Sequence, residues 1–271
     1  MSQAEVDRQG SRRWRRSHRI GPALCCAVAS LTIPAAFAGS PRASDAAAAA
    51  AVLSGKVVTI DPGHNGGNAS HTREINALVD AGGGRKKACD TTGTETNGGR
   101  LTEATFTLDV SLRLRALLQA RGARVVMTRS TNTGWGPCVD VRAKVGNDAR
   151  SDAAISVHAD GGPASGRGFH VIRPKGVRGQ DSALLARSDE LGRRVRFALG
   201  RKGYRRATYI GRDGLDLRDD LAGLNLSRVP KVLVELGNMR SAADAALMGS
   251  PKQRERMAAA LADAITNQLT R

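Results

Sequence analysis

The segment 57–64, which reads VVTIDPGH, decides the fold. It joins a β-branched apolar run to a turn that carries an aspartate and a histidine. A continuous apolar run of this length is typical of a strand buried on both faces of a parallel sheet. Proline and glycine then end the strand. His64 is therefore expected at the carboxyl edge of the sheet, where open α/β folds bind their ligands.

Outward from this segment, similar apolar runs alternate with amphipathic helical stretches. Strands are predicted at 56–61, 124–129, 153–158, 168–173 and 231–236, with a short one near 208–211. Helices are predicted at 102–121, 139–149, 182–201, 242–248 and 253–269. No fixed-period repeat interrupts this alternation. We therefore expect one α/β domain, with a mainly parallel, mixed sheet of about six strands and helices on both faces.

Two stretches do not follow the alternation. Residues 63–100 are rich in glycine, and residues 132–138 form a Gly/Pro-containing loop. Long ordered loops in a compact domain usually line a site. The first loop is interpreted as lining a substrate site, and an autoinhibitory element is the alternative.

The N-terminal residues have the layout of a secretory signal peptide. Arginines between Arg12 and Arg19 precede an apolar run at 20–37, which ends in Ala36-Phe37-Ala38. A membrane anchor is less favoured, because the run contains glycine and prolines and is short for a span of about 20 apolar residues. We predict a signal peptide at 1–38, a linker at 39–54 and a folded domain at 55–271. The route of export stays open.

The charge balance predicts a polyanionic partner. The chain has 42 Lys and Arg against 25 Asp and Glu, and an excess of 13 positive charges remains after residues 1–38 are removed. Outside the membrane, nucleic acid is not expected as a partner, whereas an anionic cell-wall surface is. A basic surface that serves only solubility is the alternative. We expect a monomer without a membrane span after signal cleavage, located in the periplasm, cell wall or extracellular space.

Two of the four cysteines, Cys89 and Cys138, remain after removal of the signal peptide. In an oxidising compartment such a pair is predicted to form a disulfide. Zinc ligation by this pair is the alternative. It is less favoured because neither cysteine has a Cys or His neighbour at ligand spacing.

Candidate site residues occur where the predicted strands end. His64, His158 and Glu235 follow or close three strands, and Glu103 lies in the first turn of a helix. Two imidazoles and a carboxylate are the ligand set of a catalytic zinc site. Each histidine alone also has a structural reading, and Glu103 has one as a helix-capping acid. Glu235 is flanked by apolar residues, so its burial without a partner would be costly unless it serves chemistry.

Several motifs in order resemble the zinc-dependent N-acetylmuramoyl-L-alanine amidases of the Amidase_3 family. The similar segments are VVTIDPGHNGG (57–67), LTEATFTLDV (101–110), VVMTR (125–129), AISVHAD (154–160) and VPKVLVELGNM (229–239). Together they cover nearly all of the predicted domain. Asn65, His71 and the segment 159–162 depart from the family pattern and put the fit of the substrate in question.

The resemblance implies roles for individual residues. His64, Glu103 and His158 would bind one Zn²⁺, and Glu235 would be the catalytic base for a zinc-activated water. The substrate would be peptidoglycan or its muropeptide fragments. The bond cleaved would be the amide between N-acetylmuramic acid and L-alanine of the stem peptide. Residues 55–271 would then be a zinc amidase catalytic domain.

Three other readings are weighed against this one. His71 and Glu74 have the H-x-x-E spacing of zinc carboxypeptidases and would combine with His158 in a peptidase that trims stem peptides. A non-catalytic wall-binding protein is the second. A serine or cysteine nucleophile is the least favoured, because no G-x-S-x-G elbow occurs and both remaining cysteines are predicted to be oxidised.

Overall fold

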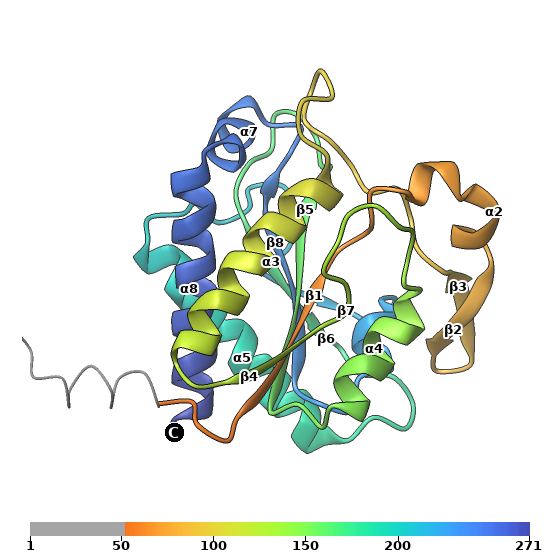
Figure 1. The fold of residues 1–271 in the computed structure, drawn as a ribbon, viewed down its shortest axis with the longest axis vertical. Helices are drawn as coiled ribbons and strands as arrows, with labels where there is room; N and C mark the ends of the chain where they lie inside the picture. Colours follow the sequence, from red (N-terminus) through yellow and green to blue (C-terminus); the bar gives the residue numbers. More distant parts are fainter. Residues whose placement is uncertain (1–51) are drawn as a thin grey trace, which may run out of the picture. The chain divides into compact units, whose positions relative to one another are not determined.

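The computed structural model describes residues 52–271, which form an α/β domain around a six-stranded sheet (Figure 1). The strands of this sheet are β1 (Val57–Pro62), β4 (Arg124–Met127), β5 (Ala153–Asp160), β6 (His170–Pro174), β7 (Leu215–Arg218) and β8 (Lys231–Asn238). The longer helices are α3 (Glu103–Ala120), α4 (Val139–Asp148), α5 (Ser182–Arg201), α7 (Ala242–Gly249) and α8 (Pro251–Leu269). Short turns of helix are η1 (Asn68–Ser70), α2 (Thr72–Ile75) and α6 (Ala222–Asn225).

The sheet is mixed, with the strand order β4-β1-β5-β8-β6-β7. The first four strands are parallel, and β6 runs antiparallel to β8. The carboxyl ends of β1, β5 and β8 consequently meet at one edge. The predicted fold class is confirmed, including the sheet of six strands.

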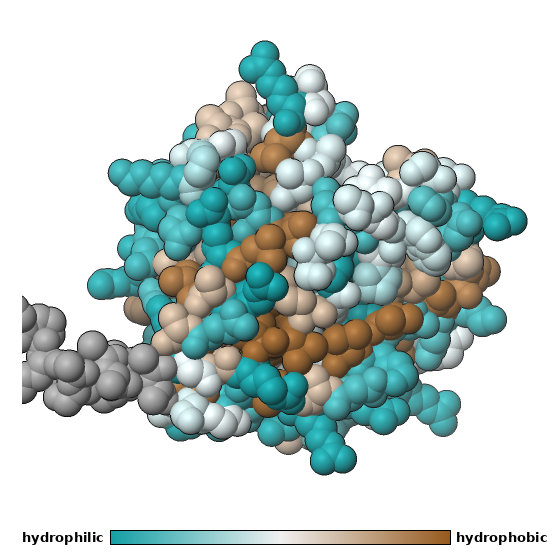
Figure 2. Space-filling model, viewed as in Figure 1, coloured by the Kyte–Doolittle hydropathy of each residue, from teal (hydrophilic) through white to brown (hydrophobic). Residues whose placement is uncertain are grey.

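Helices cover both faces of the sheet. Helices α3, α5 and α8 pack on one face, and α4 and α6 lie on the other (Figure 1). The buried line Phe106, Val110, Leu114 and Leu118 recurs every four residues along α3, so one stripe of that helix faces the sheet. Figure 2 shows an apolar band along edge strand β4, whose Val125 and Met127 are only partly buried.

Local signals explain where the helices begin. The hydroxyl of Thr102 accepts a hydrogen bond from the Thr105 amide at the start of α3. Ser250 caps α8 in the same manner, and Pro251 occupies the first helical position, where a missing N–H costs nothing. The start of α3 matters most for function, because it presents Glu103 at the edge of the sheet.

Two details of the sequence prediction are corrected. The short strand expected near 208–211 lies instead at β7, because Gly211, Asp213 and Gly214 have positive φ angles and form a tight turn. The segment 63–100, expected to be irregular, contains α2 and a hairpin of β2 (Leu78–Gly82) and β3 (Arg85–Ala88). The hairpin was not predicted because the residues that flank its glycine-rich turn at 82–84 do not alternate between apolar and polar.

The predicted signal peptide and most of the predicted linker lie outside the described residues. Within residues 52–54, Leu53 is buried in the core, and its amide donates to the carbonyl of Arg121. No helix in the part of the chain from residue 52 onward has the length and apolar character needed to cross a membrane.

Candidate metal centre

His64 stands just beyond β1 in an unusual backbone conformation. Its φ is +55°, a backbone conformation that residues other than glycine rarely adopt and that is often found at functional sites. Gly63 before it is required by close packing, because a Cβ there would lie 2.3 Å from Cε1 of His158. The tight turn thus brings the His64 imidazole next to that of His158 on a neighbouring strand.

The three predicted metal ligands converge. Nε2 of His64 lies 3.1 Å from Oε2 of Glu103, and Nδ1 of His158 lies 2.9 Å from Oε1 of the same carboxylate. The two imidazole rings have their centroids 5.0 Å apart at an interplanar angle of 85°. One ligand atom from each residue lies within 4.8 Å of the others. A single small cation could therefore contact all three side chains.

The carboxylate of Glu103 is held on both oxygens. The backbone amide of Thr94 donates to Oε2 at 3.0 Å, and that of Ala159 donates to Oε1 at 3.2 Å. Burial raises the pKa of Glu103, but the nearby charge of His64 and the hydrogen bond from His158 outweigh it and lower the pKa overall. Glu103 is therefore an anion at neutral pH, oriented before any ligand arrives.

Glu235 lies beside this cluster within the sheet. It is the register partner of His158 in the parallel pair of β5 and β8, so both side chains leave the same face. Its Oε2 atom is buried and has no hydrogen-bond partner among the described residues. Burial, followed by the charges of Glu103 and Asp160, raises its pKa well above the usual carboxyl value. A buried, unpartnered acid of this kind is typical of a functional site.

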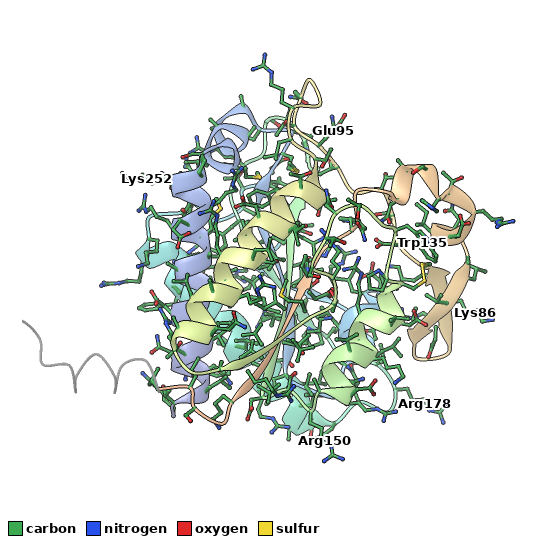
Figure 3. All side chains as sticks on the ribbon, in the orientation of Figure 1. Lys86, Glu95, Trp135, Arg150, Arg178 and Lys252 are labelled. Atoms are coloured by element: carbon green, nitrogen blue, oxygen red, sulfur yellow. A yellow bond between two sulfur atoms is a disulfide. The ribbon has the colours of Figure 1, made fainter. Side chains whose placement is uncertain are left out.

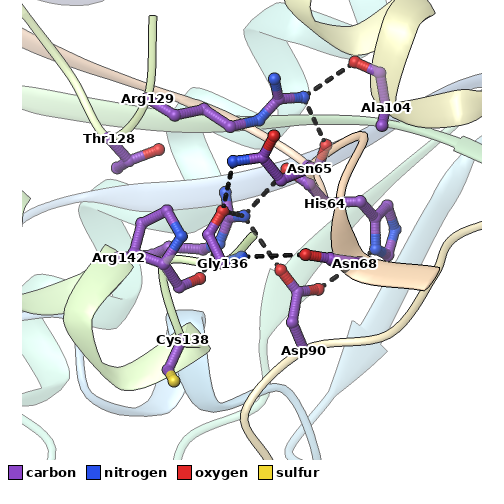
Figure 4. A network of polar contacts seen from close by, with 12 residues as sticks. His64, Asn65, Asn68, Asp90, Ala104, Thr128, Arg129, Gly136, Cys138 and Arg142 are labelled. Atoms are coloured by element: carbon purple, nitrogen blue, oxygen red, sulfur yellow. Dashed lines mark hydrogen bonds and ion pairs between the residues drawn. The ribbon is translucent and has the colours of Figure 1, made fainter. Parts of the chain in front are cut away.

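A buried arginine orients His64 from behind, as Figure 4 shows. Nδ1 of His64 lies 3.2 Å from Oδ1 of Asp90 and donates to the carbonyl of Thr91 at 3.0 Å. Nη2 of Arg142 binds the other oxygen of Asp90 at 3.0 Å and the carbonyl of His64 at 3.0 Å. Because Nδ1 is occupied, Nε2 is the nitrogen left to face Glu103.

The same arginine belongs to a buried charge network. Nη1 of Arg142 binds Oδ1 of Asp61 at 2.9 Å, and Nζ of Lys231 binds Oδ2 of Asp61 at 2.9 Å. All three side chains are almost fully buried. Burial alone would raise the pKa of Asp61, but Lys231 and Arg142 lower it well below its usual range. The network fixes the end of β1 against α4 and β8.

A disulfide ties the loop of Asp90 to the helix of Arg142. Cys89 and Cys138 are bonded in the structure, as predicted, and Cys138 immediately precedes α4. The amide of Val139 also donates to the carbonyl of Cys89 at 2.7 Å. The covalent link therefore joins the two segments that hold His64 from its Nδ1 side. This removes the alternative in which the cysteines bind zinc.

A cavity of about 320 Å³ opens from this cluster. Its lining includes His64, Glu103, His158 and Glu235, together with Lys87 of β3, Arg218 of β7 and residues of α6. This space is large enough for a peptide-sized group to reach the cluster.

The rival ligand set is not brought together. Within residues 52–271, the one group of His, Cys, Asp and Glu side chains that could hold an ion is His64, Glu103 and His158. His71 instead donates from Nδ1 to the carbonyl of Gly67 at 2.8 Å, and Glu74 lies beside Arg73. The H-x-x-E spacing of His71 and Glu74 therefore does not build a site with His158.

A family model described as N-acetylmuramoyl-L-alanine amidase matches residues 58–267. The chain belongs to this amidase family. It is 47% identical over 230 residues to an N-acetylmuramoyl-L-alanine amidase of Mycobacterium tuberculosis, across 83% of this chain and 90% of that protein. It is also 25% identical to a germination-specific N-acetylmuramoyl-L-alanine amidase of Bacillus subtilis, across 80% of this chain and 81% of that one.

Solved structures agree with this membership in the amidase family. The N-acetylmuramyl-L-alanine amidase Ami1 of Mycobacterium smegmatis superposes with a TM-score of 0.76 at 43% identity, covering 80% of this chain and 98% of that one. Ami1 of Mycobacterium abscessus gives 0.75 at 44% identity, covering 80% and 100%. The domain of this family member therefore spans almost the whole length of those structures.

Sequence reasoning about this amidase-family chain missed Asp90 and His170 around the cluster and assigned no role there to Arg142. Asp90 and Arg142 hold His64, and the buried His170 is the register partner of Glu235 on β6. Burial lowers the pKa of His170 and favours its neutral form. Only the neighbouring Cys89 hinted at Asp90. The contact of Asp90 with His64 and the pairing of His170 with Glu235 join segments that are distant in the sequence, so no local spacing reveals them.

Proposed function

We propose that the protein is a zinc-dependent peptidoglycan hydrolase. It cleaves the amide bond between N-acetylmuramic acid and L-alanine of the stem peptide. The observation that carries this proposal is the convergence of His64, Glu103 and His158 beside the unpartnered carboxylate of Glu235, within a chain of the amidase family.

The donor set fits zinc. Two imidazole nitrogens and one carboxylate oxygen are the ligands that catalytic zinc sites use, and His64 and Glu103 are oriented by further hydrogen bonds. When bound, zinc supplies Lewis acidity, which lowers the pKa of a water molecule and polarises a carbonyl oxygen. His64, Glu103 and His158 would hold it through the atoms that now converge on the Glu103 carboxylate.

Glu235 moves the proton in this proposal. Its free Oε2 accepts a proton from the attacking water and returns it to the departing nitrogen of L-alanine. The burial that raises its pKa strengthens it as a base. Asp90 and Arg142 keep the His64 ring from rotating.

We further propose where the protein acts. A signal peptide at 1–38 would export it to the periplasm, the cell wall or the extracellular space, where peptidoglycan and its fragments are found. The excess of basic residues supports attraction to an anionic wall surface. The protein would work there as a monomer.

Product identification tests the function. Peptidoglycan digested by the protein should release stem peptides with a free N-terminal L-alanine, while the glycan keeps its lactyl group, as measured by mass spectrometry. A sample stripped of metal by a chelator should leave the stem peptides attached until zinc is restored. Release of single amino acids from stem-peptide ends would instead indicate the carboxypeptidase reading. Wall binding without any release would indicate a non-catalytic protein.

Zinc binding should be pH-dependent. Burial lowers the pKa of His64 in the metal-free protein, but Glu103 and Asp90 raise it to about 10 overall. Zinc needs the neutral ring, so His64 must lose a proton when the ion binds. At pH values below that pKa, the apparent affinity for zinc should therefore rise about tenfold for each unit by which the pH is increased.

Calorimetry measures this linkage. Titrations of zinc at pH 7.5 in buffers with different ionisation enthalpies should show the release of about one proton or more per ion. His71→Ala is the control, because His71 lies outside the cluster, and it should release the same number. Zinc binding without proton release would contradict the proposed role of His64.

A further inference from the structure

A second acid, Asp160, lies beside Glu235 in the cavity of the metal centre. It follows His158 by two residues on β5, so these two side chains leave the same face of the sheet. His158, Asp160 and Glu235 all line the cavity. The charge of Asp160 is near enough to Glu235 to raise the pKa of that carboxyl. A group that receives a proton from Glu235 is therefore released into a space that Asp160 borders.

The carboxylate of Asp160 is held by one oxygen and open at the other. The hydroxyl of Tyr209 donates to Oδ2 at 2.9 Å, and the backbone carbonyl of Asp160 accepts from the amide of Met239 at 2.7 Å. Burial, followed by the charge of Asp160, raises the pKa of Tyr209, so its hydroxyl stays protonated and remains a donor. Among residues 52–271, no hydrogen bond or ion pair engages Oδ1 of Asp160. This oxygen is therefore free to accept from a ligand in the cavity.

Two glycines make room for the ring of Tyr209. A Cβ at Gly162 would lie 2.5 Å from an atom of this ring, and a Cβ at Gly166 would lie 2.6 Å from another. A larger residue at either position would push the ring away from its place. The segment 159–162, which departs from the family pattern, thus contributes both the carboxylate and part of the slot for the residue that orients it. Groups held in this manner are typical of functional sites.

The charge of the leaving group indicates what Asp160 would bind. In amide hydrolysis the C–N bond breaks and the oxygen of water joins the carbonyl carbon. At neutral pH both protons of the water end on the departing nitrogen, and the products are a carboxylate and an ammonium. The α-amino group of a peptide has a pKa of about 8, so the nitrogen of L-alanine leaves as a cation. A cation that is partly removed from water needs an anion beside it.

We propose, on the basis of the proposed function, that Asp160 binds the departing nitrogen of L-alanine and then the ammonium terminus of the released stem peptide. Oδ1 accepts from an N–H of this nitrogen while Glu235 delivers the proton to it. The positive charge therefore forms next to a carboxylate whose orientation is already fixed. Tyr209 is a positioning residue, because it acts through Asp160.

Binding of the product tests this role without catalysis. The probes are L-alanyl-D-isoglutamine and L-lactyl-D-isoglutamine, in which a hydroxyl replaces the ammonium. Calorimetry at pH 7 with zinc present should show that the unchanged protein binds the ammonium form at least about tenfold more tightly, as expected for a charge-assisted hydrogen bond. Asp160→Asn should lower this preference about tenfold and leave the affinity for the lactyl form unchanged. The asparagine keeps an oxygen for the Tyr209 hydroxyl, so the local structure is retained.

The preference should also follow the titration of the peptide. Above a pH of about 8 the amine loses its charge, and the two probes should then bind the unchanged protein with similar affinity. Both probes meet the same protein at each pH, so changes in the metal centre cancel in the ratio of their affinities. Tyr209→Phe, which keeps the ring without its hydroxyl, should lower the preference at pH 7 by less than Asp160→Asn does.

Asp148→Asn is the matched control. Asp148 lies at the end of α4, is exposed to solvent and does not line the cavity. This variant should keep the full preference for the ammonium form. Retention of the preference in Asp160→Asn, or its absence from the unchanged protein, would overturn the assignment of Asp160.

The role of Asp160 and the proposed function can fail separately. Digestion of peptidoglycan tests bond cleavage, whereas the two probes test the ammonium site in a protein that need not cut anything. A preference that is lost in Asp160→Asn, with no release of stem peptides from peptidoglycan, would support the ammonium site and reject the amidase. Release of stem peptides with no preference between the probes would do the reverse.

Discussion

Replacing Glu235 by glutamine should lower kcat on peptidoglycan about 10²- to 10⁴-fold, the range that a general base contributes. The amide is nearly the same size as the carboxylate but cannot accept the proton of the attacking water. The proposed zinc ligands His64, Glu103 and His158 are unchanged, so zinc content, measured by elemental analysis, should stay at one ion per chain. Release of stem peptides gives the rate.

The same variant should fold at least as stably. The Glu235 carboxylate is buried without a partner, and burial raises its pKa, so its charge opposes folding. Glutamine removes that charge, and the thermal midpoint should rise or stay the same. This separates loss of chemistry from loss of structure. Unchanged activity, or loss of zinc together with activity, would contradict the proposal that Glu235 is the general base.

Replacing Arg142 by methionine should destabilise the domain by about 3–5 kcal/mol, as expected when one partner of a buried ion pair is removed. Asp61 would retain Lys231, whereas Asp90 would lose its only arginine and keep the His64 ring and the Thr91 amide. The carbonyls of Pro62 and His64 would also lose a donor. Urea unfolding measures the change in the free energy of unfolding.

Arg178→Met is the matched control for this effect. Arg178 is exposed at the surface (Figure 3), so its replacement should change the free energy of unfolding by less than about 0.5 kcal/mol. The Arg142 variant should also bind zinc more weakly at a temperature where it remains folded, because His64 loses its support. A folded Arg142 variant with full zinc affinity and stability would show that the network does not hold the site.

The sequence predicted the parts of the fold that depend on local pattern. Strand β1 and helix α3 each carry an unbroken periodicity, and both were located to within a residue or two. The turn that delivers His64 followed from its proline and glycine. The hairpin β2–β3 was missed because Leu78 is exposed and the strand beside it is mostly charged, so no apolar alternation marks it.

The site divides in the same way. His64, Glu103, His158 and Glu235 were predicted because each follows or interrupts a recognisable element. Asp90 and His170 were not, since their roles come from contacts across the fold with His64 and Glu235. Apart from Cys89 beside Asp90, the neighbouring sequence does not indicate those contacts. Pairing between distant segments is set by the sheet order, which the sequence pattern leaves undetermined.

The pairing of His158 with Glu235 has one more consequence. These two side chains stand next to each other because the backbones of β5 and β8 are hydrogen-bonded in register, not because of any surface loop. Insertions or substitutions in the segments around the cavity can thus alter which substrate is recognised, while His158 and Glu235 keep their positions on β5 and β8. Divergence among related enzymes should concentrate in those segments and spare the ladder beneath them.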